Sequence, residues 1–195
     1  MVMVIKLFYP NGQRKTFQKS VINYKNRGMD LESLINSANE YYLEEDIAVI
    51  HKKPTPIGLI DVDYKKGEIK KAYFKEKSTF DYNGVYKGKY LDFEAKESKL
   101  KTSFPLANIH KHQFTHLEKI LKHGAVAFLI VFINNEYFIL KGEDLLSFIK
   151  NEKRKSIPID YFHEHCYKIE EKLRPTLDYL DIVDKIYFKG ENKNG

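Results

Sequence analysis

The chain has 195 residues, enough for one domain with a sizeable hydrophobic core. Its formal net charge of +6 favours a phosphate-rich partner, although a basic solvated surface would give the same total. Cys166 is the single cysteine, which excludes an intrachain disulfide, and the apolar run 125–133 is too short for a membrane-spanning helix. We therefore expect a cytoplasmic protein with no membrane partner.

The first half of the chain predicts a helix, a strand and a hairpin. Asp30 can cap a helix over 31–42, which carries apolar residues at helical spacing. A strand follows at 47–51 and ends before a proline-rich turn. Residues 57–64 and 68–75 then have the composition of two strands joined by a glycine-containing turn.

Residues 78–97, STFDYNGVYKGKYLDFEAKE, predict a second hairpin whose register follows from its turn. Strand-forming residues flank Lys87-Gly88, a candidate two-residue loop. With that loop, the numbers of two facing residues add up to 175, so Asp81 faces Glu94. A bulge at Asn83-Gly84 would break this register.

The same register places a lysine beside two carboxylates. Thr79 faces Lys96, and alternation puts both on the face that carries Asp81 and Glu94. Carboxylates on facing strand positions repel unless a cation lies between them, and Mg²⁺ takes oxygen ligands of this kind. The pattern indicates metal-assisted hydrolysis of an anion, although most Glu-x-Lys strand segments are only a solvated face.

The second half predicts a helix followed by a buried strand. Residues 108–124 have a helical apolar stripe and end at a glycine. The run 125–133 is typical of a buried central strand, and a turn leads into a strand at 137–140. Short helices over 143–150 and 177–188 complete the prediction.

Motifs along nearly the whole chain, from about Tyr9 to about Phe188, carry a resemblance to a known family. The motifs are YPNG (9–12), RGMDLE (27–32), NEYY (39–42), IAVIHKKPTP (47–56), AYF (72–74), DYNGVYKG (81–88), DFEAKE (92–97), KTSFPL (101–106), HKHQ (110–113), RKSI (154–157) and LDYL (177–180). By these motifs the chain resembles the RecU family of Holliday junction resolvases, within the PD-(D/E)xK nuclease superfamily. The resemblance implies a restriction-endonuclease-like α/β fold, with a mixed central sheet flanked by helices and a projecting β-hairpin stalk.

The resemblance also implies a domain organisation. We expect one nuclease domain over 1–189, with a flexible N-terminal arm at about 1–26 and the stalk at about 57–75. Residues 190–195 have the composition of a disordered tail. The segment 58–71 is shorter than its family counterpart, which leaves open a preference for another DNA structure.

Family roles carry over to five positions. The resemblance assigns metal binding to Thr79, Asp81, Glu94 and Gln113, and transition-state stabilisation to Lys96. Four of these residues are the ones that the hairpin register places on one face. The implied cofactor is Mg²⁺, for which Mn²⁺ would substitute.

Several other residues invite a functional interpretation. Glu32 could support the metal site from behind its direct ligands, or it could be a solvated helix residue. Phe80 stands where the superfamily has proline, and we expect it to pack on the face opposite Asp81. His112 and His116 have the spacing of zinc-binding helices, but phosphate contacts or helix-surface polarity are the stronger interpretations.

Basic residues flank the proposed site in three segments, where they could contact DNA or merely be solvated. They are Lys65, Lys66, Lys70, Lys71, Lys99, Lys101, Arg154 and Lys155.

The resemblance implies a homodimer that cleaves four-way junction DNA during homologous recombination and DNA repair, close to the nucleoid. The recombinase is a further implied partner. One alternative is an accessory protein that binds branched DNA without cutting it. Another is a nuclease of the same fold that prefers flaps or plain duplex.

Overall fold

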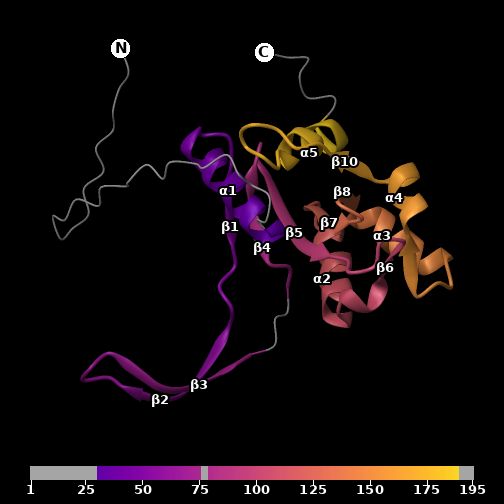
Figure 1. Ribbon diagram of the computed structural model, residues 1–195. Helices are drawn as coiled ribbons and strands as arrows, with labels where there is room; N and C mark the ends of the chain where they lie inside the picture. The colour runs from indigo at the N-terminus through magenta and orange to yellow at the C-terminus, as the bar shows by residue number, and fades with distance from the viewer. Residues whose placement is uncertain (1–29, 76–78, 189–195) are drawn as a thin grey trace, which may run out of the picture.

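The computed structural model describes residues 30–75 and 79–188, so the predicted N-terminal arm (1–26) and the tail (190–195) lie outside the described residues. Within these residues, a six-stranded mixed sheet forms the centre of the fold (Figure 1). Its strands, in order across the sheet, are β1 (Val49–Lys52), β4 (Tyr82–Tyr86), β5 (Lys89–Glu97), β7 (Val126–Ile133), β8 (Glu136–Lys141) and β10 (Tyr167–Ile169).

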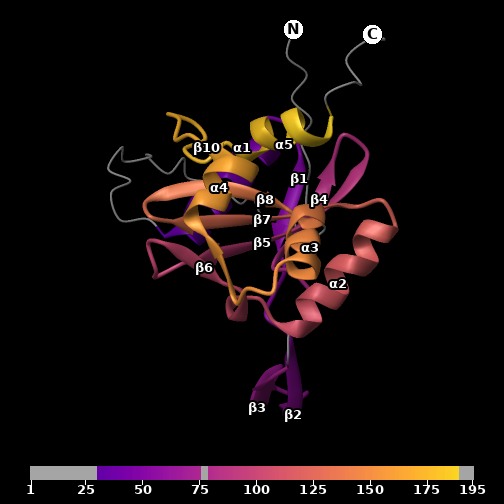
Figure 2. The same cartoon turned by 90° about the vertical axis from the view of Figure 1, so that its right-hand side faces the viewer.

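Helices pack on both faces of this sheet (Figure 2). One face is covered by α1 (Leu31–Glu44) and α5 (Tyr179–Tyr187), and the other by α2 (Lys111–Lys122), α3 (Gly142–Asn151) and α4 (Ile159–His165). The predicted mixed α/β class, with a central sheet flanked by helices, is confirmed. No helix in the described ranges combines the length and apolar character needed to cross a membrane.

The β4–β5 hairpin has the predicted register. Lys87 and Gly88 form its two-residue turn with φ angles of 47° and 72°, as a type I′ turn requires. The ladder runs from Tyr86↔Lys89 to Tyr82↔Phe93, with every pair adding up to 175 and no register shift between these ends. The bulge considered at Asn83-Gly84 does not form.

Side chains alternate along β5, so that the apolar residues and the charged residues at positions 91–96 lie on opposite faces of the sheet. Leu91 and Phe93 face α1 and α5, where the Phe93 ring stacks on Tyr82 and on Phe128 with centroid distances of 4.9 and 4.8 Å. Asp92 faces the opposite side, toward α2. Glu94 and Lys96 lie two and four positions after Asp92, so strand alternation puts all three side chains on the α2 side of the sheet.

The buried strand predicted at 125–133 is β7, which lies fourth in the sheet, parallel to β5 and antiparallel to β8. The predicted helix over 108–124 begins later, at Lys111, after the short 3₁₀ turn η1 (Leu106–Asn108). Gly124 ends it with a φ of 80°. The helix expected over 177–188 also begins later, because Leu177 packs into the core from the preceding loop.

Three short strands and one helix carry no clear sequence signal. They are β6 (Ser103–Pro105) and β9 (Ser156–Pro158), which pair as a two-stranded sheet, together with α4 and β10. Phe104 and Ile157 face each other in the small sheet and are both fully buried. A strand of three residues is too short to show periodicity, so only its distant partner defines it.

The hairpin predicted from residues 57–64 and 68–75 forms the projecting stalk, residues 57–74, which consists of β2 (Ile57–Asp63) and β3 (Glu68–Phe74) (Figure 1). Hydrogen bonds close its base. The Lys53 amide donates to the Asp81 carbonyl at 2.7 Å, and the Lys75 amide donates to the Pro56 carbonyl at 2.9 Å. The base of the stalk therefore adjoins the segment that leads into β4.

Candidate active site

Three of the predicted site residues meet where β4 begins. The Glu94 side chain is almost fully buried, at 3% exposure. Its Oε2 accepts a hydrogen bond from the Asp81 amide at 2.8 Å, and its Oε1 lies 2.9 Å from Lys96 Nζ. The backbone of Asp81 is thus held against one oxygen of Glu94, and the lysine ammonium against the other.

Glu32 influences the same buried phenol, that of Tyr82, as Asp81 and Glu94 do. It lies in α1 and forms an ion pair with Lys52. Burial raises the pKa of the Tyr82 phenol far above its usual range, and the charges of Glu32, Asp81 and Glu94 raise this pKa further.

Gln113 lies in α2, and Thr79 lies beside that helix. Gln113 is buried in the first turn of α2, where its Oε1 accepts a hydrogen bond from the His110 amide at 3.0 Å. Thr79 lines a groove together with residues of α2, among them His116. The helix therefore holds both residues on the side of the sheet that carries Glu94.

Phe80 packs as predicted, but on the other face. Its buried ring lies edge-on to the His116 ring, with centroids 5.7 Å apart, within the cluster on the α2 side. The expected alternation fails because β4 begins only at Tyr82, so residues 79–81 lie outside the ladder. For the same reason, the predicted Thr79–Lys96 facing pair does not form part of the ladder.

A buried carboxylate that the sequence analysis missed lies two residues before Glu94. Asp92 is fully buried, and its two oxygens lie 3.0 Å from Lys53 Nζ and 2.7 Å from His116 Nε2. It therefore joins the end of β1 to the middle of α2. Strand alternation could have identified it, because positions 92, 94 and 96 lie on the same face of β5.

The basic residues expected to contact DNA are exposed. Four lie on the stalk, two follow β5, and two precede β9. They are Lys65, Lys66, Lys70, Lys71, Lys99, Lys101, Arg154 and Lys155. Lys70 pairs with Asp63 at 3.1 Å, and Arg154 lies 3.8 Å from Glu152. Exposed pairs of this kind are weak and can exchange for phosphate contacts.

The donor set fits a hard divalent cation. Among the described residues, no three His, Cys, Asp or Glu side chains gather as a metal-binding group. Asp81 and Glu94 nevertheless adjoin through the Asp81 amide, and Thr79 and Gln113 lie beside or within α2 on the same side of the sheet as Glu94. Mg²⁺ is commonly bound by one or two carboxylates, with waters and substrate phosphates completing its shell.

Cys166 is expected to react slowly with thiol reagents in the folded protein. Burial, followed by the charge of Asp144, raises the pKa of its thiol to about 12. The reactive thiolate is therefore scarce, and alkylation at pH 8 should be roughly 10³-fold slower than for an exposed thiol. Iodoacetamide labelling followed by mass spectrometry measures this rate, with the unfolded chain as the control. Equal rates in folded and unfolded protein would contradict the raised pKa of the Cys166 thiol.

Comparison with known proteins shows that this chain is similar over most of its length to curated proteins of one family. "Holliday junction resolvase RecU" of Geobacillus sp. (strain WCH70) is 47% identical over 195 residues, covering 92% of this chain and 97% of that protein. The protein of the same name from Oceanobacillus iheyensis is 46% identical, covering 92% and 99%. The family model "RecU: Recombination protein U" matches residues 26–185. The chain belongs to the RecU family.

Among solved structures, the chain is similar to Archaeoglobus fulgidus Hjc, described as a Holliday junction resolvase from an archaeal hyperthermophile. The TM-score is 0.40 at 11% sequence identity, over 69% of this chain and 94% of that one.

Proposed function

We propose that this protein is an endonuclease that resolves four-way DNA junctions during homologous recombination and DNA repair. The observation that carries the proposal is the meeting of Asp81, Glu94 and Lys96 at one point of the fold. The chain belongs to a family whose relatives are named Holliday junction resolvases, which supports this substrate.

The proposed cofactor is Mg²⁺, with Mn²⁺ as a substitute. Asp81 and Glu94 would hold the ion, and Thr79 and Gln113 would complete or orient its shell. Such an ion, when bound, polarises the phosphate and makes water a better nucleophile.

The side chains of the protein have separate roles in the proposed reaction. Lys96 lies against Glu94 at 2.9 Å, where its ammonium can stabilise the negative charge that develops on the phosphate in the transition state. Glu94 also fixes the backbone of Asp81, from which the Asp81 carboxylate would reach the ion. Glu32 would support the site electrostatically from α1.

The proposed substrate needs a wider surface than this site. The exposed basic residues of the stalk and of the two loops would contact the arms of the junction through their phosphates. Symmetric cleavage of two strands requires two sites, so we propose a homodimer. The protein would act in the cytoplasm at the nucleoid, where a contact with the recombinase belongs to the same proposal.

Cleavage of a labelled four-way junction is the direct test. Purified protein with Mg²⁺ or Mn²⁺ is expected to give paired, symmetric nicks, and excess chelator is expected to abolish them because the carboxylates alone cannot activate water. Linear duplex of the same sequence is the matched substrate and should be cleaved far more slowly.

Each other outcome of this assay rejects part of the proposal. Tight junction binding without cleavage under either metal would identify a non-cleaving accessory protein. Equal cleavage of junction and duplex would identify a nuclease of the same fold with a different substrate preference.

A further inference from the structure

A groove of about 670 Å³ runs along α2 beside the candidate active site. Thr79 forms one side of it, and residues 110–119, at and within α2, form the other. The groove is open to solvent along its length, unlike the buried side chain of Glu94. Because Thr79 also belongs to the proposed metal site, the groove and that site share a boundary.

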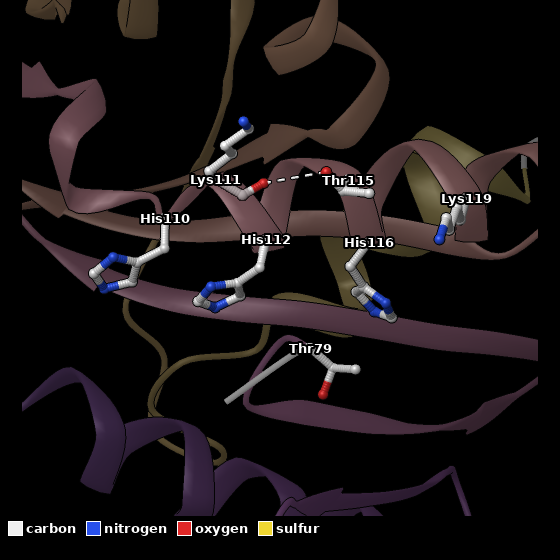
Figure 3. Close-up of a pocket in the computed structure, with 7 residues that line it drawn as sticks. All are labelled: Thr79, His110, Lys111, His112, Thr115, His116 and Lys119. Atoms are coloured by element: carbon white, nitrogen blue, oxygen red, sulfur yellow. Dashed lines mark hydrogen bonds between the residues drawn. The ribbon is translucent and has the colours of Figure 1, made fainter. Parts of the chain in front are cut away.

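The groove presents only neutral or basic side chains. Figure 3 shows the imidazoles of His110, His112 and His116 in a row on the side of the helix that faces Thr79, with the ammonium group of Lys119 beyond them. No carboxylate lines the groove in the part of the chain that the structure describes. Lys111 also lines it, but its ammonium group points away from the imidazole row.

Neighbouring contacts hold this row in place. The His110 and His112 rings stack at a centroid distance of 5.4 Å, with an angle of 13° between their planes. The buried carboxylate of Asp92 holds His116 Nε2 at 2.7 Å, and the edge-on ring of Phe80 packs against the same imidazole. The donors are therefore partly ordered before any ligand binds, which lowers the entropic cost of binding.

We propose that this groove binds the phosphodiester backbone of the DNA strand next to the bond that is cut. The proposal rests on the proposed nuclease function and extends it to histidine and lysine side chains for which the family resemblance gives no role. Imidazole N–H groups and a lysine ammonium are phosphate donors, and the absence of a carboxylate from the lining avoids repulsion.

The length of the groove agrees with a short stretch of one strand. Residues His110 to Lys119 span about 13 Å along a helix. Phosphates of one B-form strand advance by about 3.4 Å along the axis, so this length matches roughly four nucleotides. A strand with one phosphate at Asp81 and Glu94 would continue past Thr79 and along the imidazole row.

The test compares two lysines on the same helix. Lys119→Ala and Lys111→Ala each remove one exposed positive charge and introduce a good helix former. The two variants therefore have the same net charge, and both should keep the helix folded. Binding to a four-way junction and to linear duplex is measured with full-length protein in chelator, over a range of salt concentrations. Lys119→Ala should weaken binding to both DNAs by about fivefold and reduce the slope of log K against log salt by about 0.9. Lys111→Ala should have a smaller effect on both quantities, because the Lys111 ammonium group points away from the imidazole row.

A second variant and the wild-type protein complete the test. His110→Ala combined with Lys119→Ala should weaken binding further than Lys119→Ala alone. Equal losses for Lys119→Ala and Lys111→Ala, or no loss for either, would overturn the groove proposal while wild-type junction cleavage leaves the nuclease function standing. A wild-type protein that binds an acidic peptide in this groove but no DNA would reject both.

Discussion

Replacing Glu94 by glutamine is expected to reduce junction cleavage by roughly 10³-fold or more, with junction binding unchanged. The amide keeps the shape of the side chain and one oxygen that can accept from the Asp81 backbone. It removes the negative charge that the proposed cation needs and the ion pair with Lys96. Single-turnover cleavage with Mg²⁺, and binding in chelator, measure the two effects separately.

Glu97 provides the matched control on the same strand. Its Oε1 accepts a hydrogen bond from the Leu31 amide, at the start of α1, at 2.9 Å. By strand alternation its side chain lies on the opposite face of the sheet from Glu94. Glu97→Gln removes the same charge and keeps an acceptor, so cleavage should stay within about threefold of wild type. If Glu94→Gln cleaved the junction at the wild-type rate, the assignment of Glu94 to the active site would be wrong.

Replacing Asp92 by alanine is expected to lower the free energy of unfolding by about 3 kcal/mol. The change leaves Lys53 and His116 without the buried carboxylate that both contact, at 3.0 and 2.7 Å. Both side chains retain some access to solvent, which places the loss at the lower end of the range for broken buried pairs. Urea unfolding monitored by circular dichroism measures the difference.

An exposed pair gives the comparison for Asp92. Glu44 pairs with Arg174 at 3.2 Å, and both side chains are more than half exposed. Glu44→Ala should change the free energy of unfolding by less than about 0.5 kcal/mol, because solvent already screens this pair. Similar small losses for both variants would show that Asp92 does not tie β1 to α2.

The features that were predictable from sequence are the local ones. The type of turn at Lys87-Gly88 determines the pairing of its own two strands, so the neighbourhood of Asp81 and Glu94 followed from about twenty consecutive residues. The α1 cap at Asp30 and the buried β7 also follow from patterns within one element. These patterns need no knowledge of tertiary packing.

The features that were missed depend on distant residues. Asp92 is stable in the interior only because Lys53 and His116 reach it from positions 39 and 24 residues away. Phe80 was placed on the wrong face because alternation holds only within a ladder, and β4 begins only at Tyr82. Packing against His116 decides where that side chain lies.

The turn of the β4–β5 hairpin also determines where the chain can gain or lose residues. Deleting one residue and re-forming a two-residue loop would pair Tyr86 with Tyr90, and the slip would turn Glu94 toward the core and Phe93 toward α2. The stalk has no such restriction, because in the described residues β2 and β3 pair only with each other. Residues can therefore be added or removed in pairs at its tip without reversing any side chain at the site. Insertions and deletions in related chains should therefore occur in the stalk and not at Lys87-Gly88.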